Sequence, residues 1–286
     1  MESLAVALQD LVRVKWLSVY RSSGKNRPDE PSQGESSVDR RLNFLNNLLV
    51  RYFSKLAGRK EEAINHFLSR VFVALLYKGE SDSLKVAKTV DFKKLSETME
   101  AIFHQFKIED DNSRNELDTF LEVAQKASRK DTFEWSELAS LVGVLHLLKV
   151  SEEWSKTLSR QEDILKPQHD FLQIINSMLK GKELEINTRN ELEVVLGTAA
   201  HKHLSLSELS SGEKQLLIIF GEALLQDRSE FIYIADEPEL SLHVSWQENL
   251  TANLRKINPK AQVIFATHSP DIVSQYGDRV INMEEQ

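Results

Sequence analysis

The stretch "FIYIADEPELSLH", residues 231–243, decides the fold. It opens with an apolar run of the kind found in parallel strands buried on both faces, and the run ends at Asp236 and Glu237. A second apolar run, "QVIFAT" at residues 262–267, follows after one helical segment that we expect from about residue 240 to 256. Two such runs joined by one helix predict a βαβ unit with parallel strands. The last third of the chain is therefore expected to be α/β.

Polar residues follow each of these predicted strands. Asp236 and Glu237 stand at the carboxyl end of the first strand, where open α/β sheets bind ligands. Asp236 could act on Mg²⁺ through water while Glu237 orients or deprotonates an attacking water. His268 follows the second strand and could hydrogen-bond a γ-phosphate or that water. The alternatives are that an acid caps the next helix, with Pro238 in its first turn, and that His268 is a turn residue.

A third motif, "LSSGEKQ" at residues 209–215, lies upstream of both strands. Ser210 and Glu213 have the spacing of a capping box, and Gly212 lets the backbone approach a ligand closely. The free N–H groups and the helix dipole would make this helix start a seat for phosphate. The alternative is that Ser210 only caps a core helix.

The remaining chain divides into segments of different pattern. Residues 12–20 alternate like a short strand, and residues 183–196 read as a β-hairpin around "NTRN". "RVIN" at residues 279–282 is expected to be a terminal strand. Apolar residues recur at helical spacing from about residue 39 to 179, with breaks near residues 79–83, 110–113 and 128–131, and without sustained heptads. We expect four segments: 1–21, a strand of the head; 22–38, a loop; 39–179, a helical insertion without long coiled-coil arms; and 180–286, the C-terminal lobe.

Composition narrows the class of protein. The chain has 286 residues, of which 41% are hydrophobic and 28% charged, which is ordinary for a globular protein. It has no cysteine, which excludes disulfides, cysteine-based zinc fingers and thiol nucleophiles. No apolar run is long enough to span a bilayer, so we expect a cytoplasmic protein without a membrane partner. The net charge of -8 gives no support for nucleic-acid binding, although it leaves room for a local basic patch.

At these motifs the sequence resembles the ABC-type ATPase family. "LSSGEKQ" is similar to the signature motif, "FIYIADEP" to Walker B with its catalytic glutamate, "ELSLH" to the D-loop and "ATHSP" to the H-loop. The form of these motifs is most similar to the prokaryotic AAA-type ATPases of anti-phage defence systems, over about residues 180–286. The resemblance implies the α/β head of an ABC-type P-loop NTPase with a large helical insertion, ATP and Mg²⁺ as ligands, and a homodimer or higher oligomer.

The resemblance also implies roles for single residues. Asp236 would hold Mg²⁺, Glu237 would be the catalytic base and His268 the γ-phosphate sensor. Contacts to the nucleotide held by a partner protomer, or to the dimer interface, fall to six residues: Ser210, Ser211, Gly212, Glu213, Ser241 and His243. An associated effector such as a nuclease is the partner that the family suggests.

The usual phosphate-binding loop, G-x-x-x-x-G-K-[ST], has no match in the sequence. Gly24-Lys25 and Gly181-Lys182 are each followed by the wrong residue, Asn26 and Glu183. We expect that a longer chain or a second polypeptide supplies this Walker A loop, and ATP hydrolysis depends on it; the third explanation is a degenerate site. The alternative functions are a catalytically incomplete scaffold or sensor lobe, and an ATPase of DNA repair or chromosome maintenance.

Overall fold

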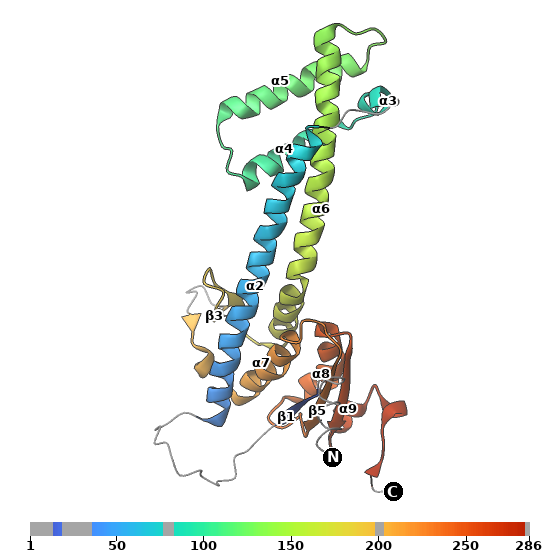
Figure 1. Ribbon diagram of the computed structural model, residues 1–286. Helices are drawn as coiled ribbons and strands as arrows, with labels where there is room; N and C mark the ends of the chain where they lie inside the picture. The colour runs from blue at the N-terminus through green and yellow to red at the C-terminus, as the bar shows by residue number, and fades with distance from the viewer. Residues whose placement is uncertain (1–13, 19–35, 77–82, 198–202, 284–286) are drawn as a thin grey trace, which may run out of the picture. The chain divides into compact units, whose positions relative to one another are not determined.

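The computed structural model describes residues 14–18, 36–76, 83–197 and 203–283 (Figure 1). The chain forms two compact units, one made of residues 1–57 and 165–286 and the other of residues 58–164. Most of the predicted loop at residues 22–38 lies outside the described residues, but Ser37 already begins a helix. The division into four segments is not tested by these two units and stays a prediction.

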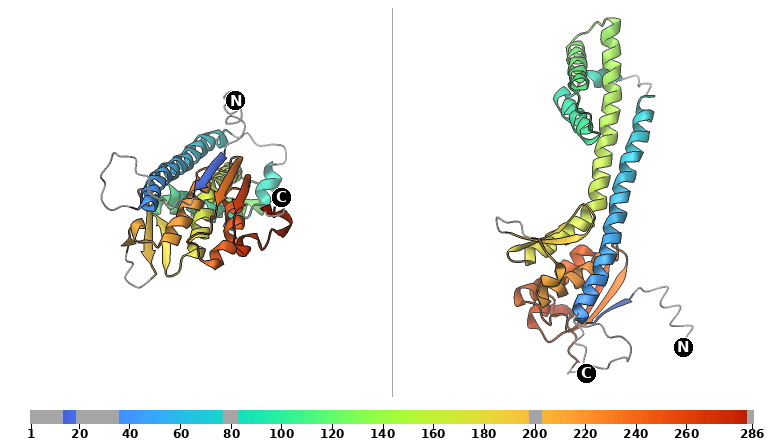
Figure 2. Two further views of the ribbon diagram at one scale, coloured as in Figure 1. Left: turned by 90° about the horizontal axis from the view of Figure 1, so that it is seen from below. Right: turned by 90° about the vertical axis from the view of Figure 1, so that its left-hand side faces the viewer.

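A parallel sheet forms the centre of the first unit (Figure 2). Its strand order is β1 (Val14–Ser18), β5 (Phe231–Asp236) and β6 (Ala261–Ala266), and α8 (Val244–Ile257) connects β5 to β6. This is the predicted βαβ unit, and the predicted strand within residues 12–20 pairs with β5 in parallel. The α/β class with a helical insertion is therefore confirmed.

Two expectations about this sheet are wrong. β6 is not buried on both faces, because Gln262, Ile264 and Ala266 are exposed and α8 packs against only part of the strand. Residues 279–282 form no strand: Arg279 ends the short 3-10 turn η2 (Gly277–Arg279), and Ile281 is 72% exposed. Their two β-branched residues, Val280 and Ile281, favour a strand, but tertiary context decides whether a strand forms, and residues 279–282 pair with no strand in the part of the chain that the structure describes.

The predicted hairpin is present as a second, antiparallel sheet. β2 (Lys182–Ile186) pairs with β3 (Leu192–Leu196), and β3 pairs with the short β4 (His203–Leu204). Asn190 has a left-handed φ of 62° in the turn, which asparagine tolerates better than most residues. The hairpin prediction is confirmed.

Helix α7 (Ser211–Leu224) is the most buried helix of the first unit, since all its residues except Ser211 and Lys214 are buried. It packs along the start of α2 (Ser37–Ala74), the 38-residue helix that opens the predicted insertion. Lys214 Nζ lies 2.7 Å from Asp39 Oδ1, and Arg41 Nη2 lies 2.9 Å from Glu222 Oε1. These two ion pairs fix α7 alongside the start of α2.

The turn from α7 to β5 is held by two long helices. Asp227 and Arg228 have φ values of 50° and 56°, a left-handed conformation that is unfavourable for both residues. The Tyr52 hydroxyl on α2 donates to Asp227 Oδ1 at 3.0 Å. Arg228 Nη2 donates to Asp170 Oδ2 at 2.9 Å, and Asp170 belongs to α6 (Trp135–Met178). The side-chain contacts offset the cost of the unusual backbone.

The second unit is helical. It contains α3 (Ser83–Lys88), α4 (Phe92–Gln105), α5 (Asp111–Ser128) and parts of α2 and α6. Asp91 caps α4 and Asp110 caps α5 by accepting backbone N–H groups. Two of the three expected helix breaks lie where they were predicted, because α5 begins at Asp111 and ends at Ser128, and most of the third, at residues 79–83, lies outside the described residues.

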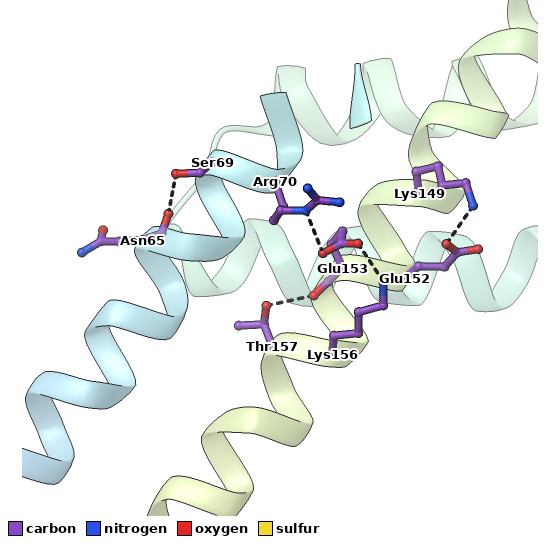
Figure 3. Close-up of polar contacts among 8 residues, drawn as sticks. All are labelled: Asn65, Ser69, Arg70, Lys149, Glu152, Glu153, Lys156 and Thr157. Carbon is purple, nitrogen blue, oxygen red and sulfur yellow. Dashed lines mark hydrogen bonds and ion pairs between the residues drawn. The ribbon is translucent and has the colours of Figure 1, made fainter. Parts of the chain in front are cut away.

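Within this unit α2 and α6 lie side by side. The rings of Phe67 and Trp154 pack edge to face with centroids 5.0 Å apart. Arg70 Nε on α2 lies 3.4 Å from Glu153 Oε2 on α6, and Figure 3 shows this contact. The helices have 38 and 44 residues, so the expectation of no long paired helices is wrong. Their contact uses large aromatic side chains rather than a sustained heptad repeat, which is why the sequence pattern did not reveal it. No described helix is long and apolar enough to cross a membrane.

Candidate nucleotide-binding site

The carboxyl ends of β5 and β6 bring the predicted catalytic residues to one edge of the sheet. Asp236 is the partner of Ala266 in the strand register, and the Glu237 N–H donates to the Ala266 carbonyl at 2.7 Å. Asp236 and Glu237 therefore leave β5 next to the point where Thr267 and His268 leave β6. This is the edge at which parallel sheets bind ligands.

The side chains of Asp236, Glu237 and His268 at this edge are accessible to solvent and have no hydrogen-bond partner among the described residues. Asp236 and His268 are exposed, Glu237 is half-buried, and none of the three side chains forms a hydrogen bond or ion pair with a described residue. Glu237 has a φ of 45°, a strained conformation for a residue with a side chain. Such strain persists where the surroundings fix it, and here the backbone bond to Ala266 does so.

The alternative reading of the acids as helix caps is wrong. Helix α8 begins at Val244, later than the expected start at about residue 240, and its cap is His243. The His243 Nδ1 atom accepts the Ser245 N–H at 3.3 Å and lies 2.8 Å from Ser245 Oγ. The segment between β5 and α8 is a turn, in which Leu240 and Ser241 are exposed.

The start of α7 is held by a complete capping box. Ser210 Oγ accepts the Glu213 N–H at 3.3 Å, and Glu213 Oε2 accepts the Ser210 N–H at 2.8 Å. Glu213 is also bonded by Lys182 Nζ at 3.0 and 2.8 Å. Burial acts to raise the pKa of Glu213, but the bonds from Lys182 and Ser210 outweigh it and hold that pKa below the ordinary value. The Glu213 carboxylate is thus already satisfied within the chain, while Ser210 and Ser211 are exposed.

Gly212 joins this helix start to the turn after β5. A Cβ atom on Gly212 would lie 2.4 Å from the Ser241 carbonyl oxygen and 3.3 Å from Trp246 Cζ3. No side chain fits at that position without displacing the backbone of Ser241, which itself has a φ of 72°. The signature-like and D-loop-like segments of one chain are therefore in direct contact.

One residue of the site was missed at the sequence level. Glu239 Oε1 accepts hydrogen bonds from Thr267 Oγ1 at 2.6 Å and from the His268 N–H at 3.2 Å. Glu239 links the turn after β5 to the turn after β6. The only signal was a third carboxylate in "DEPE", which gives no hint of its partners.

The donor set fits Mg²⁺ only in part. Mg²⁺ keeps several waters and takes one or two carboxylates together with phosphate oxygens, so the exposed Asp236 carboxylate is a suitable single ligand. Among the described residues, no group of three or more His, Asp or Glu side chains is placed to hold a metal by itself.

The family assignment follows from this geometry and from sequence comparison. Residues 16–274 match the family described as "AAA domain, putative AbiEii toxin, Type IV TA system". The chain belongs to this family. The match covers most of β1, the insertion and the signature, Walker B, D-loop and H-loop motifs, so the resemblance to AAA- and ABC-type ATPases is confirmed.

Three curated proteins are similar to parts of this AAA-domain chain. The chain is 24% identical over 252 residues to the Retron Vc95 probable ATPase of Vibrio cholerae, covering 81% of this chain and 46% of that protein. It is 26% identical over 143 residues to the Septu protein PtuA of Bacillus thuringiensis, covering 45% of this chain and 35% of PtuA. The Hemin import ATP-binding protein HmuV of Aliivibrio fischeri is 26% identical over 185 residues, covering 60% and 63%. The chain spans less than two thirds of the length of each.

Proposed function

We propose that this AAA-domain chain binds and hydrolyses ATP with Mg²⁺ in a composite site formed by two protomers. The observation that carries the proposal is the meeting of Asp236–Glu237 and Thr267–His268 at the ends of adjacent parallel strands. Asp236 would hold Mg²⁺, Glu237 would accept a proton from the attacking water, and His268 would contact the γ-phosphate. The bound ion would supply charge neutralisation at the phosphates.

The start of α7 would serve the nucleotide of the partner protomer. Ser210 and Ser211 are exposed at a helix N-terminus, where free N–H groups and the dipole favour an anion. Gly212 lies against Ser241, so the helix start and the D-loop-like turn present one surface, with His243 at its far end. A homodimer or higher oligomer is the assembly that uses this surface.

The phosphate-binding loop that completes the site has no counterpart in the sequence, so the chain alone is expected to bind ATP weakly. Backbone N–H groups and a lysine of that loop normally supply most contacts to the β- and γ-phosphates. Isothermal titration of the chain with Mg-ATP is expected to give a dissociation constant well above the micromolar range. A sub-micromolar constant would contradict the composite site.

The biological role that fits best is regulation of an associated effector, such as a nuclease, in defence against phage. The names of the retron and Septu relatives support this role. The net charge of -8 gives no support for a DNA-repair role.

The deciding experiment is Glu237→Gln in the complete natural protein. Without a base the water is not activated, and we expect ATP turnover to fall by about 100-fold or more while ATP-bound dimers accumulate. Turnover by a phosphate-release assay and mass by light scattering measure the two effects. The matched control is Glu248→Gln on the exposed face of α8. A scaffold without catalysis would show no turnover in the wild-type protein and no change in oligomeric state.

A further inference from the structure

The turn after β6 is tied to the segment between β5 and α8 at successive residues. The backbone bond from Glu237 to Ala266 ends the β ladder. Beyond it, Glu239 Oε1 accepts Thr267 Oγ1 at 2.6 Å and the His268 N–H at 3.2 Å. Thr267 Oγ1 in turn accepts the Ser269 N–H at 3.0 Å. Among the described residues, Glu239 is therefore the one side chain that accepts hydrogen bonds from both Thr267 and His268, the predicted phosphate sensor.

Using the Glu239 carboxylate for this link lowers the stability of the fold. Its Oε2 atom is buried and accepts no hydrogen bond from any residue in the described ranges. A buried carboxylate oxygen without a donor costs stability, and a neutral side chain could accept the same two bonds. A carboxylate makes stronger and shorter bonds to its donors than a neutral acceptor does. Glu239 thus holds Thr267 and the His268 N–H in place with strong hydrogen bonds, at a cost to the stability of the fold.

Other contacts also hold the turn after β6 against the rest of the unit. Ser269 Oγ donates to Gln247 Oε1 at 2.7 Å, which already fastens the start of α9 (Pro270–Val273) to α8. Ile272 is buried and anchors the same helix. What Glu239 adds is the position of His268 relative to the acids at the end of β5.

We propose that Glu239 is a positioning residue, which fixes the backbone of His268 so that the imidazole faces the space next to Asp236 and Glu237. The inference rests on the proposed function, in which these three residues act on one nucleotide. It adds a residue that contacts neither nucleotide nor metal and works through Thr267 and His268.

The first test measures the tether itself and needs no catalysis. Amide hydrogen exchange of His268, followed by NMR in the complete natural protein, is expected to accelerate about fivefold or more in Glu239→Ala, because the acceptor of that N–H is gone. Glu239→Gln keeps an acceptor oxygen but makes weaker bonds, so its exchange rate is expected to lie between those of the wild type and Glu239→Ala. Glu248→Ala removes an exposed carboxylate from α8 and is the matched control. The amide of the buried Leu250 reports whether the fold is intact.

The second test separates positioning from simple stabilisation. For Glu239→Ala we expect kcat for ATP to fall by about tenfold or more, with KM nearly unchanged, since a small misplacement of a reacting group is costly. Glu239→Gln, a weaker acceptor, is expected to recover part of kcat. Thr267→Val removes the donor to Glu239 and the acceptor of the Ser269 N–H but leaves the bond from the His268 N–H, so it is expected to lower kcat less than Glu239→Ala does.

The outcomes of these tests are distinguishable. Unchanged exchange at His268 in Glu239→Ala would overturn the tether, whatever the kinetics give. Faster exchange with unchanged kcat would overturn the positioning role. A wild-type protein that hydrolyses no ATP would overturn the proposed function, and the exchange measurement would still decide the tether.

Discussion

The two parts of the candidate site differ in how far their polar groups are satisfied within the chain. At the start of α7, Ser210, Glu213 and Lys182 bond one another. At the ends of β5 and β6, the side chains of Asp236 and His268 are exposed and bond no described residue. The comparison teaches that the polar groups of the first part are satisfied within the chain, whereas the carboxylate and imidazole of the second have no partner among the described residues.

Removing the Lys182–Glu213 ion pair at the start of α7 should have the largest effect on the free energy of unfolding. Lys182→Met leaves the buried Glu213 carboxylate without its cation, and we expect a loss of about 3 kcal/mol in the free energy of unfolding. Urea titration at neutral pH measures it, with Lys180→Met at an exposed position as control. A loss no larger than that of the control would show that the capping box alone satisfies Glu213.

The pH dependence of this loss has a defined sign. The pKa of Glu213 is lowered in the folded protein, so its ionised form stabilises the fold above the ordinary pKa of 4.5, and this contribution disappears as the pH falls through the lower folded value. In Lys182→Met the carboxylate is buried without its cation. The stability gap between variant and wild type should therefore shrink below about pH 4.5, and a gap that grows on acidification would contradict this assignment.

Gly212→Ala tests the junction between the two parts. The added methyl group would lie 2.4 Å from the Ser241 carbonyl, so the backbone must move, and we expect a loss of about 2 kcal/mol. Gly58→Ala in α2 is the opposite control, because nothing lies within 4 Å of its Cβ position. There the substitution should stabilise the helix by about 0.5–1 kcal/mol. Equal melting temperatures for the two variants would contradict the close approach.

The end of β5 should keep its stability when the charge of Asp236 is removed. Asp236 has no described partner, so Asp236→Asn is expected to change the free energy of unfolding by less than about 0.5 kcal/mol. Calorimetry measures this change, and the same variant is expected to lose Mg²⁺-dependent ATP turnover. A large loss of stability would show that Asp236 is a structural residue.

Local patterns in the sequence predicted the parts of the fold that local forces decide. The apolar runs of β5 and β6, the capping spacing of Ser210 and Glu213 and the hairpin turn each depend on neighbours in sequence. Residue types also marked Asp236, Glu237 and His268 as candidates, and the structure brings them to one sheet edge, while their chemical roles stay predictions.

The features that the sequence did not predict depend on contacts between segments that are distant in sequence. The link from Glu239 to Thr267, the Lys182–Glu213 pair and the approach of Gly212 to Ser241 join segments whose distance in space has no local signature. The same holds for residues 279–282, which pair with no strand in the part of the chain that the structure describes. The pairing of α2 with α6 depends on aromatic packing that a heptad search does not detect.

The turn between α7 and β5 depends on two helices. Its two left-handed residues, Asp227 and Arg228, are each bonded by a different long helix, Tyr52 from α2 and Asp170 from α6. Removing either bond would leave one of the two left-handed residues without its helix contact, so the cost of this turn is shared by two helices that lie far apart in the sequence.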